Sequence, residues 1–291
     1  MSLISIVIPA IKFDQTLRFC LDSLVKQKNV SLEVWVIFNP SKPNLDFSDW
    51  PSWIQFVESE KGVNCARNWG IRKSTADLIF FLDSDCVLND PYHITKIIKF
   101  MELHPNASGV GGGYKVPQQV NLATKTYNYL QMDWLRQQII SADHRSKALI
   151  GGHMLLNKSK LPDLRFDENI LFGGSEKELF VRLADSKTEF YLDLNFTILH
   201  ISELTQKELL KKAKAQGRGE RYIRTQYKTT KGDTFCYLIK PDFEPEWAKF
   251  IEGYERVFSK HSGSGTINKF SIRKILYRII EHINVSQFGG N

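Results

Sequence analysis

The sequence predicts an α/β fold in which helices flank a mostly parallel sheet. Three apolar runs rich in β-branched and aromatic residues, at 4–9, 33–38 and 78–82, are predicted to be buried strands. The segments 17–25 and 65–74 between them repeat apolar residues at helical spacing. Strand, helix, strand, helix, strand is the order of a doubly wound sheet, in which helices connect parallel strands.

The rest of the chain continues with both kinds of element in a less regular order. Helices are expected at 92–103, 125–140 and 176–184, strands at 110–114 and 190–194, and a loop followed by a strand within 149–156. Beyond residue 204 the sequence is helical and basic, and the Ser/Gly-rich segment 261–265 is expected to be a flexible joint before an amphipathic helix at 267–283. We therefore expect one domain over residues 1–225 and a helical C-terminal extension over 226–291, packed on that domain.

Composition excludes several classes of protein. The chain of 291 residues is 42% hydrophobic and 24% charged, which is typical of a globular protein and not of a disordered or fibrous one. No apolar run approaches the roughly 20 residues of a membrane-spanning helix, and the start of the chain has no basic signal-peptide region. These features predict a cytoplasmic protein. The cysteines Cys20, Cys65, Cys86 and Cys236 form no C-x-x-C pair, so we expect free thiols in a reducing compartment.

The net charge of +7 suits an anionic partner such as a diphosphate, a phospholipid surface or nucleic acid, but a solvated basic surface explains it equally well. Basic residues recur in 208–224 and 267–283, where they could contact lipid headgroups at the inner face of a membrane. No recognisable nucleic-acid-binding motif accompanies them, so we expect no nucleic-acid partner.

The most informative polar residues directly follow the apolar strand 78–82. Ligands of an open parallel sheet bind beyond the carboxyl ends of its strands, where Asp83-Ser84-Asp85 is placed. Two carboxylates one residue apart beside a buried strand are costly unless a positive charge lies near them. Oxygen ligands suit Mg²⁺ or Mn²⁺, often together with substrate phosphates. A turn that caps the following segment is the alternative explanation.

Several short motifs occur together with this acidic pair, in a fixed order. They are Ile6-Val7-Ile8-Pro9-Ala10, Ala66-Arg67-Asn68-Trp69-Gly70-Ile71, Phe81-Leu82-Asp83-Ser84-Asp85, Val110-Gly111-Gly112-Gly113, Arg165-Phe166-Asp167-Glu168, Gly174-Ser175-Glu176-Lys177-Glu178-Leu179 with Arg182, and His200. Over roughly residues 3–220 this order resembles the large family 2 of inverting GT-A glycosyltransferases. The order is far more specific than any one of these motifs.

The resemblance implies a GT-A fold and a site for a divalent metal, Mn²⁺ or Mg²⁺. Asp85, the second acid of the D-x-D element, would ligate the ion, and His200 matches the position of a further metal or diphosphate ligand. Alternatively, His200 is an ordinary histidine at a strand end whose ring is hydrogen-bonded within the protein. Asp83 would face the ribose or the metal shell. The ion would neutralise the diphosphate as it leaves.

For the donor, the resemblance implies a binding set that consists of Pro9, Ala10, Asn39, Arg67, Asp83 and Ser84. Relatives typically have Asp-Asp-Gly-Ser where this chain has Phe38-Asn39-Pro40-Ser41, so the donor base stays open among UDP, GDP and dTDP sugars. Arg67 would either pair with the diphosphate or brace the acidic loop, and an ordinary surface salt bridge is the alternative.

For the acceptor, alignment on Glu178-Leu179 and Arg182 places Glu176 at the family's catalytic aspartate and Ser175 at its preceding glutamate. Glu176 would then be the general base, one methylene longer than usual. The two residues also suit the start of a helix, through capping and the helix dipole. Gly152 and His153, in Gly151-Gly152-His153-Met154, complete the expected acceptor region together with Ser175, although a tight turn would also explain the glycines.

The function expected from these observations is inverting transfer of a sugar from a nucleotide-diphosphate donor to a hydroxyl of a glycan or lipid-linked acceptor, in bacterial surface-glycan synthesis. Two rivals stay open. A sugar nucleotidyltransferase would need a glycine-rich, Arg-containing loop after the first strand, and residues 10–14 do not provide one. A catalytically impaired nucleotide-sugar-binding or scaffold protein of the same fold would explain the departures at Phe38-Asn39 and Ser175-Glu176.

Overall fold

The computed structural model describes residues 3–171, 173–184 and 188–227. The chain divides into two compact units. The first comprises Met1–Pro117, Gln138–Leu171 and Ser175–Ser202, and the second comprises Gln118–Gln137, Phe172–Gly174 and Glu203–Asn291. The residues proposed for chemistry all belong to the first unit, which is described first.

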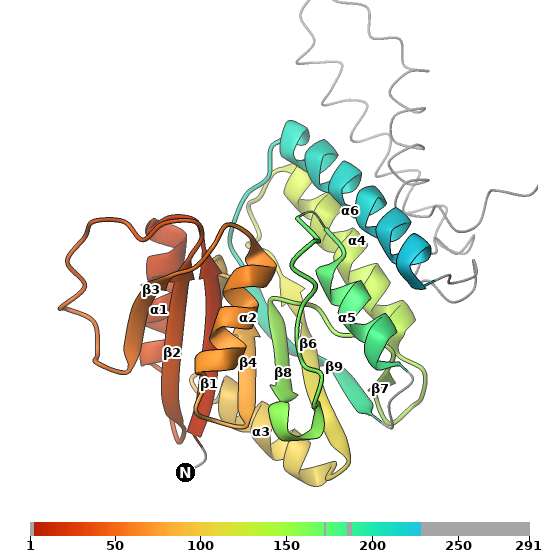
Figure 1. The fold of residues 1–291 in the computed structure, drawn as a ribbon, viewed down its shortest axis with the longest axis horizontal. Helices are drawn as coiled ribbons and strands as arrows, with labels where there is room; N and C mark the ends of the chain where they lie inside the picture. Colours follow the sequence, from red (N-terminus) through yellow and green to blue (C-terminus); the bar gives the residue numbers. More distant parts are fainter. Residues whose placement is uncertain (1–2, 172, 185–187, 228–291) are drawn as a thin grey trace, which may run out of the picture. The chain divides into compact units, whose positions relative to one another are not determined.

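The first unit is built on a nine-stranded mixed sheet in the order β3-β2-β1-β4-β8-β6-β9-β5, with β7 paired to β9 (Figure 1). Its strands are β1 (Leu3–Ala10), β2 (Ser31–Phe38), β3 (Ile54–Glu58), β4 (Leu78–Leu82), β5 (Cys86–Val87), β6 (Ala107–Lys115), β7 (Arg145–Ser146), β8 (His153–Asn157) and β9 (Glu189–His200). Strands β3, β2, β1 and β4 are parallel neighbours, as are β6 and β9. Strand β8 runs antiparallel to β4 and β6. The sheet is therefore parallel from β3 to β4 and mixed from β8 onward.

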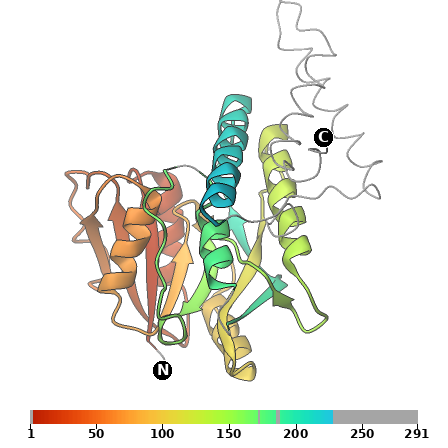
Figure 2. The same cartoon turned by 45° about the vertical axis from the view of Figure 1, so that its right-hand side comes forward.

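The helices of this unit are α1 (Gln15–Val25), α2 (Val63–Lys73), α3 (His93–Leu103) and α5 (Ser175–Leu183), with a short 3₁₀ turn, η1 (Lys158–Lys160). Helix α1 begins at Asp14, whose carboxylate accepts hydrogen bonds from the backbone N–H groups of Thr16 and Leu17. Helix α2 lies along β1, as the turned view shows (Figure 2). A Cβ at Gly70 would come within 2.5 Å of the Val7 side chain, so this close packing requires glycine.

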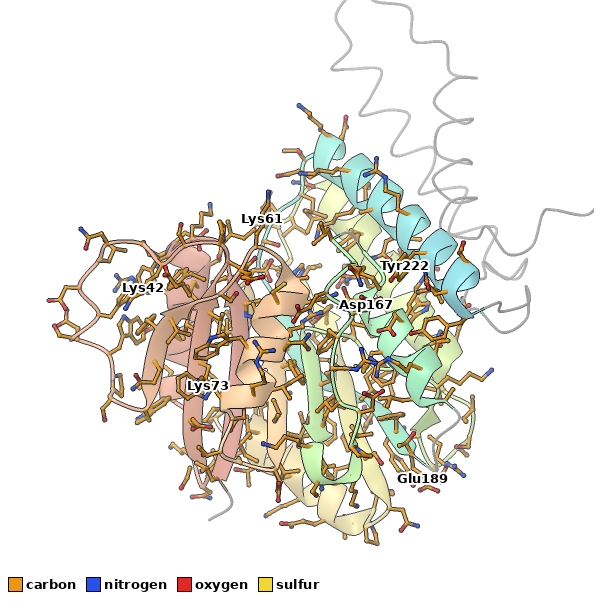
Figure 3. The ribbon with its side chains drawn as sticks, in the orientation of Figure 1. Lys42, Lys61, Lys73, Asp167, Glu189 and Tyr222 are labelled. Carbon is orange, nitrogen blue, oxygen red and sulfur yellow. The ribbon has the colours of Figure 1, made fainter. Side chains whose placement is uncertain are left out.

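The core of the unit is formed by the strands that precede the predicted site. Residues Ile4, Ile6, Val7 and Ile8 of β1 are fully buried, as are the last four residues of β4. Such strands are covered on both faces, which is why they read as unbroken apolar runs in the sequence. Basic side chains such as Lys42, Lys61 and Lys73 are exposed (Figure 3), consistent with a solvated basic surface on this unit.

The second unit contains α4 (Leu122–Gln138) and α6 (Gln206–Tyr227). These helices pack through a small apolar cluster of Ala123, Leu204 and Leu209, and the Lys212 ammonium lies 4.8 Å from the Tyr127 ring centroid. A Cβ at Gly219 would come within 1.9 Å of the Gly173 carbonyl oxygen, so α6 approaches that segment backbone to backbone. Among the helices of the described residues, none is both long and apolar enough to cross a membrane.

Most predicted elements are confirmed, with shifted ends. Strand β3 and the two-residue strands β5 and β7 were not predicted, and β9 is one strand of twelve residues where the sequence suggested a short one at 190–194. The loop and strand expected within 149–156 are confirmed as a turn at residues 151–152 followed by β8. The extension over 226–291, the joint at 261–265, the helix at 267–283 and Cys236 lie outside the described residues, apart from Gln226 and Tyr227 at the end of α6.

Candidate active site

The Asp83-Ser84-Asp85 turn lies at the carboxyl end of β4 and is held by backbone hydrogen bonds to two other strands. The N–H of Asp83 donates to the Gly152 carbonyl at 3.3 Å, and the Asp85 carbonyl accepts from the N–H of Ile201 at 2.9 Å. The turn itself closes through the Cys86 N–H, which donates to the Asp83 carbonyl at 3.0 Å. The two acids are thereby fixed at the edge where an open α/β sheet binds its ligands.

Asp85 and His200, the predicted metal ligands, lie together. The His200 Nε2 is 3.2 Å from Asp85 Oδ2, and His200 ends β9 directly opposite Cys86 of β5. The His200 side chain is nearly enclosed, and the Tyr114 ring stacks on it with centroids 5.2 Å apart and an interplanar angle of 21°. An imidazole nitrogen and a carboxylate oxygen at this separation form a donor pair that suits a divalent ion such as Mn²⁺.

Arg67 of α2 connects two acids that are 93 residues apart in the sequence. Its guanidinium nitrogens lie 3.0 Å from Glu176 Oε1 and 3.5 Å from Asp83 Oδ1, and it stacks over the Phe166 ring at 5.0 Å. Only 4% of the Arg67 side chain is exposed, which excludes the ordinary surface salt bridge. Burial opposes its charge, but Glu176 and Asp83 outweigh that effect, so the pKa of Arg67 is raised. Arg67 therefore braces the acidic loop.

The adjacent residues Gly151 and Gly152 make room for these charged groups. A Cβ at Gly151 would lie 2.0 Å from Glu176 Oε1 and 2.7 Å from an Arg67 nitrogen. A Cβ at Gly152 would lie 2.1 Å from Asp83 Oδ2 and 2.4 Å from the Tyr114 hydroxyl. No other residue type fits at either position without displacing the acids, so both glycines serve the close approach of the backbone to the charged cluster.

The carboxylates crowd one another. Desolvation raises the pKa of Asp83 above its ordinary value, Arg67 lowers it, and the nearby Asp85 and Glu176 carboxylates raise it again. The Tyr114 hydroxyl is 3.5 Å from Asp83 Oδ2, within reach of a long hydrogen bond. Burial therefore makes the largest contribution to the raised pKa of Asp83, and the neighbouring acids add to it.

His153, predicted to line the acceptor region, has a ring enclosed in the protein. Its Nδ1 is 3.1 Å from the Gly113 carbonyl oxygen and its Nε2 is 2.9 Å from Nε2 of His93 on α3. Burial lowers the pKa of both histidines. The ring thus joins β8 to β6 and α3, and a contact between His153 and an acceptor, which stays a prediction, would involve its backbone.

Helix α5 presents Glu176 from its first turn. Ser175 is buried at the first residue of the helix, and 24% of the Glu176 side chain is exposed. Behind this turn Glu178, which is 1% exposed, accepts from Arg182 Nε at 2.8 Å within the same helix. Arg182 in turn donates to the Asp163 carbonyl at 2.9 Å and so anchors the helix. The motif around Glu176 therefore combines one accessible acid with one buried structural ion pair.

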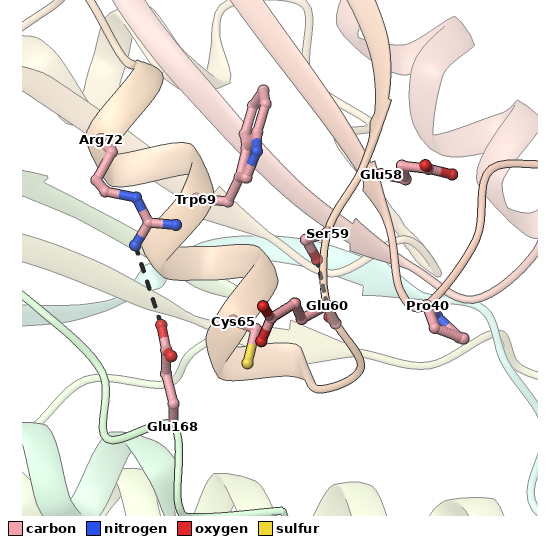
Figure 4. Close-up of a pocket in the computed structure, with 8 residues that line it drawn as sticks. All are labelled: Pro40, Glu58, Ser59, Glu60, Cys65, Trp69, Arg72 and Glu168. Atoms are coloured by element: carbon pink, nitrogen blue, oxygen red, sulfur yellow. Dashed lines mark hydrogen bonds and ion pairs between the residues drawn. The ribbon is translucent and has the colours of Figure 1, made fainter.

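At the predicted donor loop, Asn39 ties the ends of β1 and β2 together. Its side-chain amide nitrogen donates to the Ala10 carbonyl at 3.0 Å, as does its backbone N–H at 2.9 Å. Next to it opens a groove of about 580 Å³ that is lined by Pro40, Glu58, Ser59, Glu60, Cys65, Trp69, Arg72 and Glu168 (Figure 4). Pro9 and Ser84 lie at the ends of β1 and β4, and both are partly buried.

Three residues of the cluster were not predicted: Tyr114, Cys86 and Phe166. Tyr114 follows three glycines within β6, and the sequence placed it in that strand without a role. Phe166 lay within a quoted motif without a role. Cys86 follows the acidic pair directly, but a single thiol carries no pattern of its own in a sequence.

Comparison with known proteins finds a family model that matches more than half of the chain. The family model described as glycosyl transferase family 2 matches residues 5–165. The glycosyltransferase GlyA of Streptococcus pneumoniae serotype 4 is 28% identical over 117 residues, which are 38% of this chain and 17% of that protein. The chain therefore matches well under two thirds of the length of this curated relative.

Two solved structures share the fold. The mannosyltransferase PcManGT from Pyrobaculum calidifontis, in complex with GDP-Man and Mn²⁺, has a TM-score of 0.56 at 11% identity, with 96% of this chain and 86% of that one covered. The S. aureus TarS fragment 1–349, in complex with UDP, has a TM-score of 0.51 at 14% identity, with 99% and 90% covered. At these identities the likeness shows the GT-A fold.

Proposed function

Because the chain belongs to glycosyl transferase family 2, we propose that it transfers a sugar from a nucleotide-diphosphate sugar to an acceptor hydroxyl with inversion. The observation that carries this proposal is the convergence of Asp83, Asp85 and Glu176 on the same edge of the sheet, with Arg67 between two of them. Family membership makes the chain a glycosyltransferase. The donor, the inversion and the acceptor are the proposed part.

The residues at the end of β4 and β9 fit a divalent ion. Asp85 and His200 would hold it, because their oxygen and nitrogen ligand atoms face each other at 3.2 Å. When bound, Mn²⁺ or Mg²⁺ supplies the positive charge that stabilises the leaving diphosphate. The crystallised mannosyltransferase of the same fold contains Mn²⁺, which supports this choice of ion.

Glu176 is the proposed general base. The acceptor oxygen attacks the anomeric carbon from the side opposite the diphosphate, its proton passes to the Glu176 carboxylate, and the bond to the diphosphate oxygen breaks. Arg67 donates to Glu176 Oε1 at 3.0 Å and so orients the carboxylate. Positioning of this kind is what a base on a helix terminus needs to meet a hydroxyl in the correct geometry.

The nucleotide is proposed to bind along Pro9, Ala10 and Asn39, with Asp83 and Ser84 toward its ribose. The Asn39 amide nitrogen is engaged by Ala10, so its side-chain oxygen is the group offered to the base. The acceptor, proposed to be a glycan or lipid-linked saccharide of the bacterial surface, would approach past Gly152 and Ser175. Neighbours of the same fold were crystallised with GDP-Man and with UDP, which supports a nucleotide-sugar donor but leaves its base open.

Calorimetry with UDP, GDP and dTDP, each with and without Mn²⁺, tests the donor site. We expect one nucleotide to bind in a Mn²⁺-dependent manner and to lose this dependence in Asp85→Ala. Binding of none of the three would contradict the donor site.

The variant Glu176→Gln tests the base. Gln can still accept the Arg67 hydrogen bond but cannot take a proton, so transfer should fall by about 10²–10⁴-fold while donor affinity changes by less than about twofold. Glu102→Gln, an exposed acid on α3, is the matched control and should retain full transfer. Nucleotide binding without any transfer by the wild-type chain would instead support the impaired, donor-binding alternative.

A further inference from the structure

Cys86 places a thiol beside the two proposed metal ligands. The ligand atoms of Asp85, Cys86 and His200 all lie within 4.8 Å of one another. We propose that these three residues form a site for thiophilic divalent ions such as Zn²⁺ and Cd²⁺, which bind there more tightly than Mn²⁺ and displace it, inhibiting transfer. The inference rests on the proposed function, because it places Zn²⁺ or Cd²⁺ at the site proposed for the Mn²⁺ or Mg²⁺ that supports sugar transfer.

Strand pairing brings the thiol to this point. Cys86 of β5 and His200 of β9 are directly opposite in an antiparallel pair, so their side chains share one face of the sheet. Asp85 lies in the turn before β5, outside the alternation of the strand, and its carboxylate reaches the same face at 3.2 Å from His200 Nε2. Side-chain movements of about 1 Å would give the separation of roughly 3.5 Å that tetrahedral ligands of one ion keep.

The donor set differs from that of a hard-ion site. Mn²⁺ prefers oxygen ligands and stands at the weak end of the divalent series, whereas a thiolate with an imidazole favours Zn²⁺ and its heavier relatives. On coordination the S–H bond of Cys86 breaks, a bond from sulfur to the metal forms, and the proton passes to the buffer. Binding through the Cys86 sulfur therefore releases one proton more than binding through Asp85 and His200 alone.

An ion can reach the thiol from one side. The Asp85 side chain is 26% exposed, whereas His200 is nearly enclosed and Cys86 is fully buried. We therefore expect the ion to bind to the Asp85 carboxylate first and then to the buried Cys86 sulfur. Cys20 of α1 provides a matched control, because its thiol is also fully buried, contacts the Asp83 carbonyl at 3.7 Å and is absent from the ligand cluster.

The test is a Cd²⁺ titration of the full-length protein without nucleotide, followed by the ultraviolet charge-transfer band of a cadmium–thiolate bond and by calorimetry. We expect the band in the wild type and in Cys20→Ser and its loss in Cys86→Ser. Affinity for Cd²⁺ should fall at least about tenfold in Cys86→Ser, since removal of a supporting group alone costs that much. Affinity for Mn²⁺ should change less than affinity for Cd²⁺.

A band of undiminished intensity in Cys86→Ser, or Cd²⁺ binding to the wild type without a band, would overturn the inference. If Cys86→Ser does not fold, the protons released per ion by the wild type with Cd²⁺ and with Mn²⁺, measured in buffers of different ionisation enthalpy, decide instead. One more proton with Cd²⁺ than with Mn²⁺ supports the thiol, and equal release excludes it. If instead the proposed function is wrong, the wild type would show the Cd²⁺ band but bind no nucleotide, so the two failures can be told apart.

Discussion

The buried pair of His93 and His153 should make the stability of the fold sensitive to acid. The His153 Nδ1 faces the Gly113 carbonyl, which can only accept a hydrogen bond, so Nδ1 carries the hydrogen. In a neutral ring the His153 Nε2 then accepts, and the donor is His93 Nε2 at 2.9 Å. Protonation of His153 at Nε2 would set two N–H groups against each other at this distance, and protonation of His93 at Nδ1 would leave this hydrogen bond in place but create a charge inside the protein.

The size of the effect follows from the pKa of His93. Burial lowers this pKa from 6.5 to about 4, with Asp90 raising it and Lys96 lowering it to smaller extents. Between these values the unfolded chain binds a proton that the folded chain does not, so the stability present above pH 6.5 is lost as the pH falls toward 4. At 1.36 kcal/mol per pH unit, the loss reaches about 2 kcal/mol at pH 5 and about 3 kcal/mol at pH 4.

The assay is urea unfolding at pH 7.5 and pH 5 of the wild type, His93→Gln and a control, His104→Gln. Gln can donate to His153 Nε2 and does not titrate, so at pH 7.5 the variant should lose at most about 1 kcal/mol. Its loss of stability between the two pH values should be smaller than that of the wild type by about 2 kcal/mol. His104 is half-buried and bonds to the Phe100 carbonyl, and its variant should keep the wild-type pH dependence. An unchanged pH dependence in His93→Gln would refute the reasoning.

Two further predictions concern the groups that shape the site. Gly152→Ala would place a Cβ 2.1 Å from Asp83 Oδ2, so Mn²⁺-dependent nucleotide binding should fall. Gly109→Ala is the control, because its Cβ would meet the Leu156 side chain at 2.4 Å and does not touch the acids. This control should lower the urea midpoint without loss of nucleotide binding. Equal effects on nucleotide binding would contradict the assignment. Asn68 donates to the Phe166 carbonyl at 2.8 Å and accepts from its N–H at 2.7 Å, so Asn68→Asp, which turns the donor into an acceptor, should cost about 1–3 kcal/mol in unfolding free energy. A cost below about 0.5 kcal/mol would show that this buried pair is dispensable.

The sequence predicted the parallel half of the sheet well, for a physical reason. Strands buried on both faces are continuous apolar runs, and the groups that follow them must gather at one edge. Asp83, Asp85 and Asn39 were found in this way. Strand β3 was missed because only two of its five residues, Ile54 and Phe56, are buried, so its pattern is too short to stand out.

Local patterns could not show which side chains meet across the fold. The pairing of Arg67 with both Asp83 and Glu176 depends on how α2 and α5 flank β4, which no spacing in the sequence encodes. The same holds for His153, whose partner His93 is 60 residues away. The glycines before His153 were assigned to the acceptor region, with a tight turn as the alternative. They form a turn, and their small size admits the Asp83 and Glu176 carboxylates.

The charge balance of the cluster gives a physical reason to expect a cation there. Within the described residues, the carboxylates of Asp83, Asp85 and Glu176 gather around one fixed positive charge, Arg67, which is already shared between two of them. The Asp85 carboxylate lies 3.2 Å from Nε2 of His200, a group that carries charge only when protonated. A diphosphate could not approach three acids without a compensating charge, and a divalent ion at Asp85 would supply it. Burial first, and then the nearby carboxylates of Asp85 and Glu176, raise the pKa of Asp83. The repulsion among these acids favours binding of the ion before, or together with, the donor.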